Sequence, residues 1–115
     1  MRVAVVGSRN LTVDHLEKYL PEDTEEIVSG GAVGIDTCAR RYALANNIPL
    51  TEFRPEYKKY GRSAPLLRNI SIIEYADLVL IFWDGRSAGS RHVIEQCRKL
   101  GREYRVFLPD RGPVA

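Results

Sequence analysis

Short apolar runs alternate with amphipathic stretches along the chain, and this pattern predicts alternating strands and helices. The apolar runs have the length and composition of β-strands. They are Arg2 to Val6, Glu25 to Ser29, Ile48 to Phe53, Asp77 to Trp83 and Tyr104 to Leu108. The first run is typical of a central parallel strand buried on both faces, and the fourth is the most apolar segment of the chain.

Apolar residues at helical spacing predict two helices in the first half of the chain. Thr12 or Asp14 can cap the first helix, and Pro21 ends it. The second runs from about 34 to 46, where Asn46 and Asn47 suit a left-handed C-terminal cap. Their apolar positions are Val13, Leu16 and Leu20, and then Ile35, Cys38, Ala39, Tyr42 and Ala43.

Two further helices are predicted in the second half. Ser63 can cap the first of them, with Pro65 tolerated in its first turn, while Ser90 can cap the second and Gly101 ends it. Their buried positions are expected at Leu66, Ile70 and Ile73, and at Val93, Ile94, Cys97 and Leu100. Residues 54–62 form a polar connection long enough to be a functional loop.

The alternation of strands and helices predicts an α/β protein with three layers around a five-stranded parallel sheet. The doubly wound strand order 3-2-1-4-5 is our prediction, which places a ligand outside the carboxyl ends of strands one and four. We expect one domain at 1–108 and a short, frayed tail at 109–115.

Composition narrows the function only slightly. The 115 residues fit one domain, and 44% hydrophobic residues suffice for a single core. The apolar runs are shorter than the ~20 residues of a membrane helix, and no leader opens the chain, so we expect a cytoplasmic protein with no membrane partner. Cys38 and Cys97 are expected to be buried in a reducing compartment, and no metal site is predicted. The net charge of +2 does not by itself indicate a nucleic-acid binder.

Three glycine-bearing loops follow predicted strands and are the candidate ligand site. Glycine lets backbone N–H groups approach a phosphate at a helix N-terminus, although a tight turn without ligand also uses glycine. The first loop holds Gly7, Ser8 and Arg9, and the second holds Ser29, Gly30, Gly31, Gly34 and Asp36. The third holds Asp84, Gly85, Ser87, Gly89, Ser90, Arg91 and His92.

Other polar side chains complete this hypothesis. Asp36 would repel a phosphate, so we expect it to fix its loop or accept a hydrogen bond from a ribose hydroxyl. Arg68 and Asn69 start a helix and face either ligand or solvent. Tyr60, in a cluster of basic and aromatic residues, is interpreted as part of a lid or base-stacking wall.

Catalysis would depend on two residues of the third loop. His92 is the best general acid–base candidate in the predicted site, with Asp84 as its companion, because His15 lies on a helix away from the crevice. The alternative is that His92 is a hydrogen-bonded bystander.

Several motifs together resemble the SLOG superfamily. They are Val3-Ala4-Val5-Val6-Gly7-Ser8-Arg9, Ile27-Val28-Ser29-Gly30-Gly31-Ala32-Val33-Gly34-Ile35-Asp36, Leu67-Arg68-Asn69 and the segment from Phe82 to His92. Within this superfamily the chain is most similar to small, single-domain YspA-type proteins related to YpsA. The resemblance implies a Rossmann-like fold that binds nucleotides or nucleotide-derived ligands.

Three functions follow from relatives within the superfamily. The YpsA branch implies binding of a nucleotide or ADP-ribose-like ligand, which we prefer; no other cofactor is expected. The Lonely guy branch implies hydrolysis of the N-glycosidic bond of a nucleoside 5'-phosphate, but residues 84–90 lack its P-G-G opening and the following glutamate. The DNA-processing protein A branch implies binding of single-stranded DNA.

Tyr19, Tyr42 and Tyr75, if exposed on helices, would support a homo-oligomer.

Overall fold

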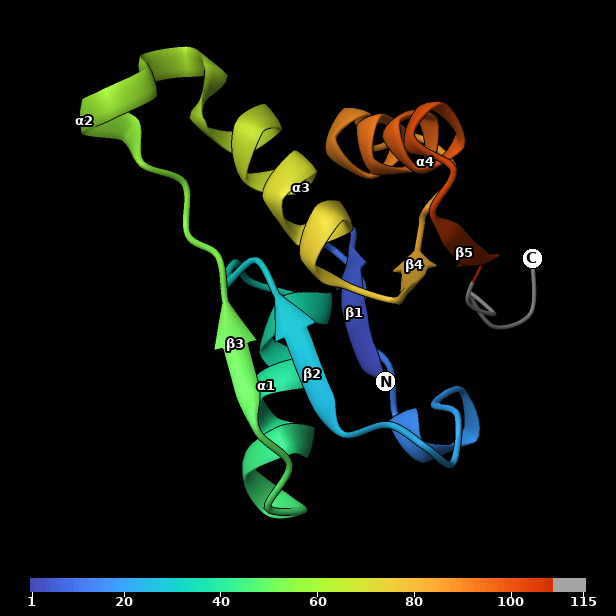
Figure 1. The fold of residues 1–115 in the computed structure, drawn as a ribbon. Coiled ribbons are helices and arrows are strands. Elements are labelled where there is room, and N and C mark those ends of the chain that lie inside the picture. Colours follow the sequence, from blue (N-terminus) through green and yellow to red (C-terminus); the bar gives the residue numbers. More distant parts are fainter. Residues whose placement is uncertain (109–115) are drawn as a thin grey trace.

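Five parallel strands form one sheet in the order β3-β2-β1-β4-β5, as predicted (Figure 1). The structure is a computed structural model and describes residues 1–108, so the tail expected at 109–115 lies outside the described residues. The strands are β1 Arg2–Gly7, β2 Glu26–Ser29, β3 Leu50–Glu52, β4 Leu78–Phe82 and β5 Glu103–Phe107. Gly7 pairs with Phe82, so β1 and β4 end level with each other.

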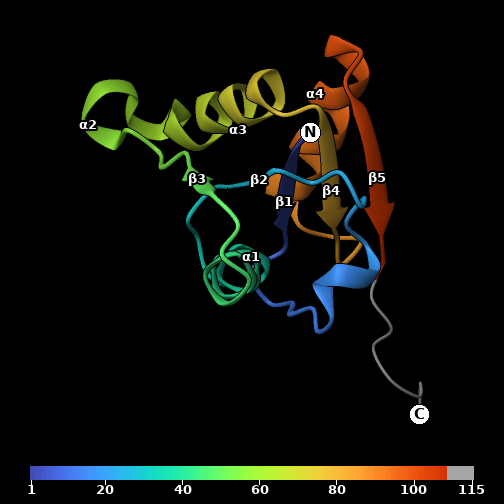
Figure 2. The same cartoon turned by 60° about the horizontal axis from the view of Figure 1, so that its bottom comes forward.

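Helices cover both faces of the sheet and make the three predicted layers. Figure 2 shows α3 and α4 on one face and α1 on the other. The α-helices are α1 Ile35–Ala45, α2 Tyr57–Tyr60, α3 Ala64–Tyr75 and α4 Ala88–Leu100, and the 3-10 helices are η1 Leu16–Lys18 and η2 Gly61–Ser63. The described chain therefore has a Rossmann-like α/β fold.

The two central strands divide the core between the two layers of helices. Because side chains alternate along a strand, Val3 and Val5 of β1 pack on the α1 side while Ala4 and Val6 pack under α3 and α4. β4 is buried along its whole length. This packing fixes the carboxyl ends of β1 and β4, from which two of the candidate loops start.

The helix predicted before Pro21 is wrong. Only the single turn η1 forms, and His15 just before it has a φ of 56°, a left-handed conformation that an α-helix does not contain. Val13, Leu16 and Leu20 still pack against the core. Their spacing resembles that of a helix, but here these side chains hold an irregular segment against the core.

The region before α3 also differs from the prediction. Residues 54–62 are not an open loop, because they contain α2 and most of η2. Ser63 makes no capping hydrogen bond, since η2 leads directly into α3 and leaves Ser63 with helical backbone angles. Pro65 does lie in the first turn of α3, as predicted.

The C-terminal ends of α1 and α4 agree with the prediction, whereas some positions predicted to be buried on α3 and α4 do not. Asn47, with φ 54°, and Gly101, with φ 70°, adopt the left-handed conformations expected after α1 and α4. Leu66 and Leu100 are exposed rather than buried. On α3, Asn69 is buried beside Ile72 and Ile73, so that helix turns a polar residue inward.

The tyrosines expected to support a dimer pack within the protein. Tyr19 lies with its ring centroid 5.0 Å from that of Phe82, and the Tyr75 hydroxyl donates a hydrogen bond of 2.6 Å to Glu26. Tyr42, on α1, is partly buried against the core. Within residues 1–108, no helix is long and apolar enough to cross a membrane.

Candidate ligand-binding cleft

A cleft of about 450 Å³ opens where the sequence predicted the site, beyond the carboxyl ends of β1 and β4. The starts of α3 and α4 form its other walls. It is lined by Val6, Gly7, Ser8, Arg9, Asn10, Gly30, Ala32, Asp36, Pro65, Leu66, Arg68, Asn69, Ile72, Asp84, Ser87, Gly89, Ser90 and Val93. The volume is within the range usual for pockets that bind small molecules.

Ser8 ties the first loop to the third. Its backbone N–H donates to the Phe82 carbonyl at 3.0 Å, and its hydroxyl oxygen accepts a hydrogen bond of 3.1 Å from the Asp84 N–H. Ser8 is therefore buried as a structural link, whereas Arg9 next to it is exposed at the cleft.

Asp84 builds the turn that leads into α4. Its carboxylate accepts hydrogen bonds from the backbone N–H of Arg86 at 2.8 Å and from the backbone N–H and hydroxyl of Ser87 at 2.7 and 2.8 Å. The N–H groups of Ser87 and Arg86 hold the pKa of the Asp84 carboxyl well below its usual range. Asp84 is therefore a carboxylate at neutral pH.

The start of α4 differs from the prediction in one respect. Ser90 is not the cap, because the helix begins at Ala88 and Ser87 occupies the capping position. Ser90 lies in the first turn with its side chain buried. Gly89, in the same turn, faces open space where a Cβ would meet no atom within 4 Å.

The second loop uses its glycines for contacts within the protein. A Cβ on Gly30 would lie 2.6 Å from Nη1 of Arg68, and one on Gly34 would lie 2.5 Å from the carbonyl oxygen of Arg9. Gly31, with φ 72°, packs beside Arg54. These contacts favour the alternative interpretation, a tight turn, for Gly31 and Gly34.

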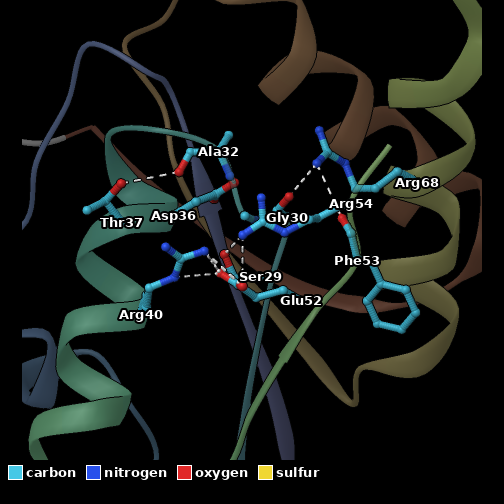
Figure 3. A network of polar contacts seen from close by, with 11 residues as sticks. Ser29, Gly30, Ala32, Asp36, Thr37, Arg40, Glu52, Phe53, Arg54 and Arg68 are labelled. Atoms are coloured by element: carbon cyan, nitrogen blue, oxygen red, sulfur yellow. Dashed lines mark hydrogen bonds and ion pairs between the residues drawn. The ribbon is translucent and has the colours of Figure 1, made fainter. Parts of the chain in front are cut away.

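Asp36 fixes the second loop, which is the first of the two roles expected for it. Its Oδ2 accepts a hydrogen bond of 3.1 Å from the Ala32 N–H, while its buried Oδ1 has no hydrogen-bond partner among residues 1–108 (Figure 3). Burial raises the pKa of Asp36 above its usual value, opposed by the Ala32 N–H and by Arg68 and Arg9. Asp36 therefore lines the cleft as an incompletely satisfied carboxyl group.

Arg68 joins α3 to the second loop (Figure 3). Its Nη1 donates hydrogen bonds to the carbonyl oxygens of Gly30 at 2.8 Å and Phe53 at 3.4 Å. Burial lowers the pKa of the Arg68 guanidinium, and Asp36 opposes this effect, but an arginine stays charged in proteins. The side chain thus places a fixed positive charge between two clefts that it lines.

Asn69 extends this network to His92. Its Oδ1 accepts a hydrogen bond of 2.9 Å from Nε of Arg68, which leaves its amide nitrogen 3.3 Å from Nδ1 of His92. Because an amide nitrogen only donates, Nδ1 accepts and the proton of a neutral His92 lies on Nε2. Burial lowers the pKa of His92, opposed by Glu95, so the ring is neutral at neutral pH.

The structure brings together only part of the predicted site. Among the described residues, the cleft lining includes Gly7, Ser8, Arg9, Gly30, Asp36, Arg68, Asn69, Asp84, Ser87, Gly89 and Ser90. It does not include Ser29, Gly31, Gly34, Tyr60, Gly85, Arg91 or His92. Arg91 instead lies over the Trp83 ring, with its guanidinium carbon 5.7 Å from the ring centroid.

Sequence analysis missed most of the apolar wall of the cleft. Pro65, Leu66, Ile72 and Val93 line it beside the polar residues. Leu66 follows the helical spacing of a core residue but is exposed, because it projects from the first turn of α3 into the cleft. The sequence around residues 64–66 does not indicate a cleft, because apolar residues at helical spacing occur both where a helix packs on the core and where it lines a cleft.

Within residues 1–108, potential metal ligands do not cluster, and the Cys97 thiol is buried. No group of three or more potential metal ligands occurs within residues 1–108. Burial raises the pKa of the Cys97 thiol to about 11, opposed by Arg102, so the thiolate is disfavoured at neutral pH. Cys38 is partly buried and its Sγ lies 3.5 Å from the Val13 N–H.

The described residues have a Rossmann-like α/β fold with a small-molecule-sized cleft at its topological switch point. Residues 1–51 match the family described as DNA recombination-mediator protein A. The chain is also similar to Gene 61 protein of Mycobacterium phage D29, at 36% identity over 81 residues. That match covers 65% of this chain and 65% of the phage protein, and no solved structure matches significantly. The family match over residues 1–51 agrees with the DNA-processing protein A side of the SLOG resemblance.

Proposed function

We propose that residues 1–108 form one domain that binds a phosphorylated nucleoside, such as a nucleotide or an ADP-ribose-like derivative. One observation carries this proposal: the open first turn of α4, two arginines and the Asp36 carboxyl group line the same cleft at the switch point. Ligands of doubly wound folds occupy this position.

The walls of the cleft favour one orientation of the ligand. The first turn of α4 offers backbone N–H groups that an α-helix does not use internally, and the helix dipole favours an anion there. Gly89 leaves this turn accessible, and Arg9 adds positive charge. The phosphate therefore lies against α4, while a sugar hydroxyl donates a hydrogen bond toward Asp36.

Binding without hydrolysis fits the site better. Asp84 is engaged by Arg86 and Ser87, and its strongly lowered pKa makes it a weak base. His92 contacts Asn69 rather than lining the cleft. Prolonged incubation should leave the nucleotide intact, and release of free base would overturn this part of the proposal.

Single-stranded DNA is the second candidate ligand. The match of residues 1–51 to the DNA recombination-mediator protein A family favours it, because that segment includes Arg9 and Asp36. Such binding would weaken steeply with salt, since phosphate neutralisation releases counterions. A nucleoside monophosphate would show a much weaker salt dependence.

A thermal-shift titration with nucleoside monophosphates tests the proposal. A ligand at 100 times its Kd stabilises the folded state by about 2.7 kcal/mol, which gives a clear rise in Tm. Arg9→Gln should reduce the shift, whereas the matched control Arg91→Gln should preserve it because Arg91 lies over Trp83. No shift of the unmodified protein with any nucleoside phosphate would contradict the proposal.

A further inference from the structure

A second cleft of about 350 Å³ lies on the other side of α3. Leu67, Ser71 and Glu74 of α3 line it, whereas Asn69 and Ile72 of the same helix line the first cleft. Tyr60, which the sequence placed near a base in the main site, lines this second cleft instead. Two pockets, each large enough for a nucleoside-sized group, therefore flank one helix.

Arg68 is common to both clefts. Its Nε and Nη1 are held by Asn69, Gly30 and Phe53, while Nη2 forms no hydrogen bond with any of residues 1–108. A guanidinium with a remaining donor between two pockets is suited to a phosphate oxygen.

We propose that the second cleft binds the base of a second nucleoside, joined through phosphate to the nucleotide in the first cleft. This inference rests on the proposed function. The linking phosphate lies at Arg68, so the ligand class is a compound with two nucleoside units, joined by either a pyrophosphate or a phosphodiester.

The chemistry of the second cleft suits a planar, nearly neutral ring. Tyr60 is 41% exposed, and Nζ of Lys59 lies over one face of its ring, 5.2 Å from the ring centroid. A base would therefore stack on the other face of the ring. Stacking of a base on an aromatic ring contributes about 1–3 kcal/mol.

The charges around the second cleft are mixed. Arg54, Lys59 and Arg68 are balanced in part by Glu56 and Glu74. Because the charges that line the second cleft nearly cancel, the cleft favours a base over a further phosphate. The two glutamates can accept hydrogen bonds from the exocyclic amino groups of a base. The phosphate charge is therefore assigned to Arg68 and the base to Tyr60.

Calorimetric titration of the full chain tests the inference with three ligands: adenosine monophosphate, two adenosines joined by a pyrophosphate, and a 5'-phosphorylated adenosine dinucleotide joined by a phosphodiester. At least one two-nucleoside ligand should bind at least tenfold more tightly than the monophosphate. The linkage with the larger gain identifies the source of the ligand.

Two tyrosine variants locate the effect. Tyr60→Ala should reduce the gain by the part that base stacking supplies and leave the affinity for the monophosphate unchanged. The matched control Tyr57→Ala, on the same helix but outside the lining of the second cleft, should keep the gain. Equal affinity for all three ligands, or a gain that Tyr60→Ala leaves undiminished, would overturn the inference while leaving the proposed function standing. If no ligand binds, both proposals fail.

Discussion

Two glycine-bearing turns look alike in sequence but serve different purposes. The turn between β2 and α1 packs its glycines inside the protein: Gly30 against Arg68, and Gly34 against the backbone of Arg9. The turn between β4 and α4 is held instead by the Asp84 carboxylate, and Gly89, in the first turn of α4 that follows it, faces open space. The first turn is a scaffold, and the second is an accessible surface.

The difference comes from what each turn must contact. Arg68, Arg54 and Asp36 crowd the first turn, so a side chain at its glycines would collide with neighbours. The second turn receives its order from hydrogen bonds to a side chain that precedes the helix, which leaves the helix start free. A glycine-rich pattern alone therefore does not locate a phosphate.

The largest effect is expected from Gly34→Ala. The residue has φ 77°, which alanine rarely adopts, and its Cβ would lie 2.5 Å from the Arg9 carbonyl oxygen. We expect a loss of about 3 kcal/mol in the free energy of unfolding, from backbone strain and steric overlap. Urea denaturation measures it, and a loss below the level of an ordinary surface substitution would contradict the scaffold role.

A smaller and opposite change in stability is expected from Gly89→Ala. Alanine is favoured over glycine in a helix, and its methyl group meets no atom within 4 Å, so the free energy of unfolding should rise by about 0.5–1 kcal/mol. The same methyl group stands at the proposed phosphate position, so nucleotide affinity should fall. Denaturation and calorimetric titration of the same sample separate the two effects. A variant that binds as tightly as the unmodified protein would argue against a phosphate at α4.

The smallest effect is expected in the pH dependence of stability at Asp36. Because burial raises its folded pKa above the usual value of 3.8, the folded protein binds more protons than the unfolded chain in this window. The free energy of unfolding should therefore fall as pH rises from near 3.8 through the raised pKa. Asp36→Asn should lack this component, and the difference between the two denaturation profiles isolates it. Parallel profiles would show that Asp36 does not titrate abnormally.

The sheet order was predictable because apolar runs and amphipathic stretches alternate regularly. The position of the cleft followed from that order, and Ser8, Arg9, Asp36 and Asn69, which the sequence analysis named as candidate ligand-binding residues, lie in its lining. The false helix near Leu16 shows the limit, because periodic anchoring of an irregular segment resembles an amphipathic helix.

The placement of side chains around α3 was beyond the sequence. Whether Tyr60 lies in the first or second cleft depends on α2 and η2, which bring the chain around the outer end of α3 (Figure 1). Likewise, Arg68 was identified as a candidate, but its hydrogen bonds to Gly30 and Phe53 join segments far apart in sequence. Such contacts depend on tertiary packing rather than on local pattern.

Titration of the ¹⁵N-labelled protein with a nucleoside monophosphate, followed by amide chemical shifts, tests the contrast between the two turns most directly. The proposed site predicts saturable shifts that are largest at residues 88–90, with Arg9 also affected and much smaller changes at Gly31 and Gly34. Largest shifts at Gly31 and Gly34, or no saturable shift at residues 88–90, would contradict the assignment of the β4–α4 turn as the phosphate site.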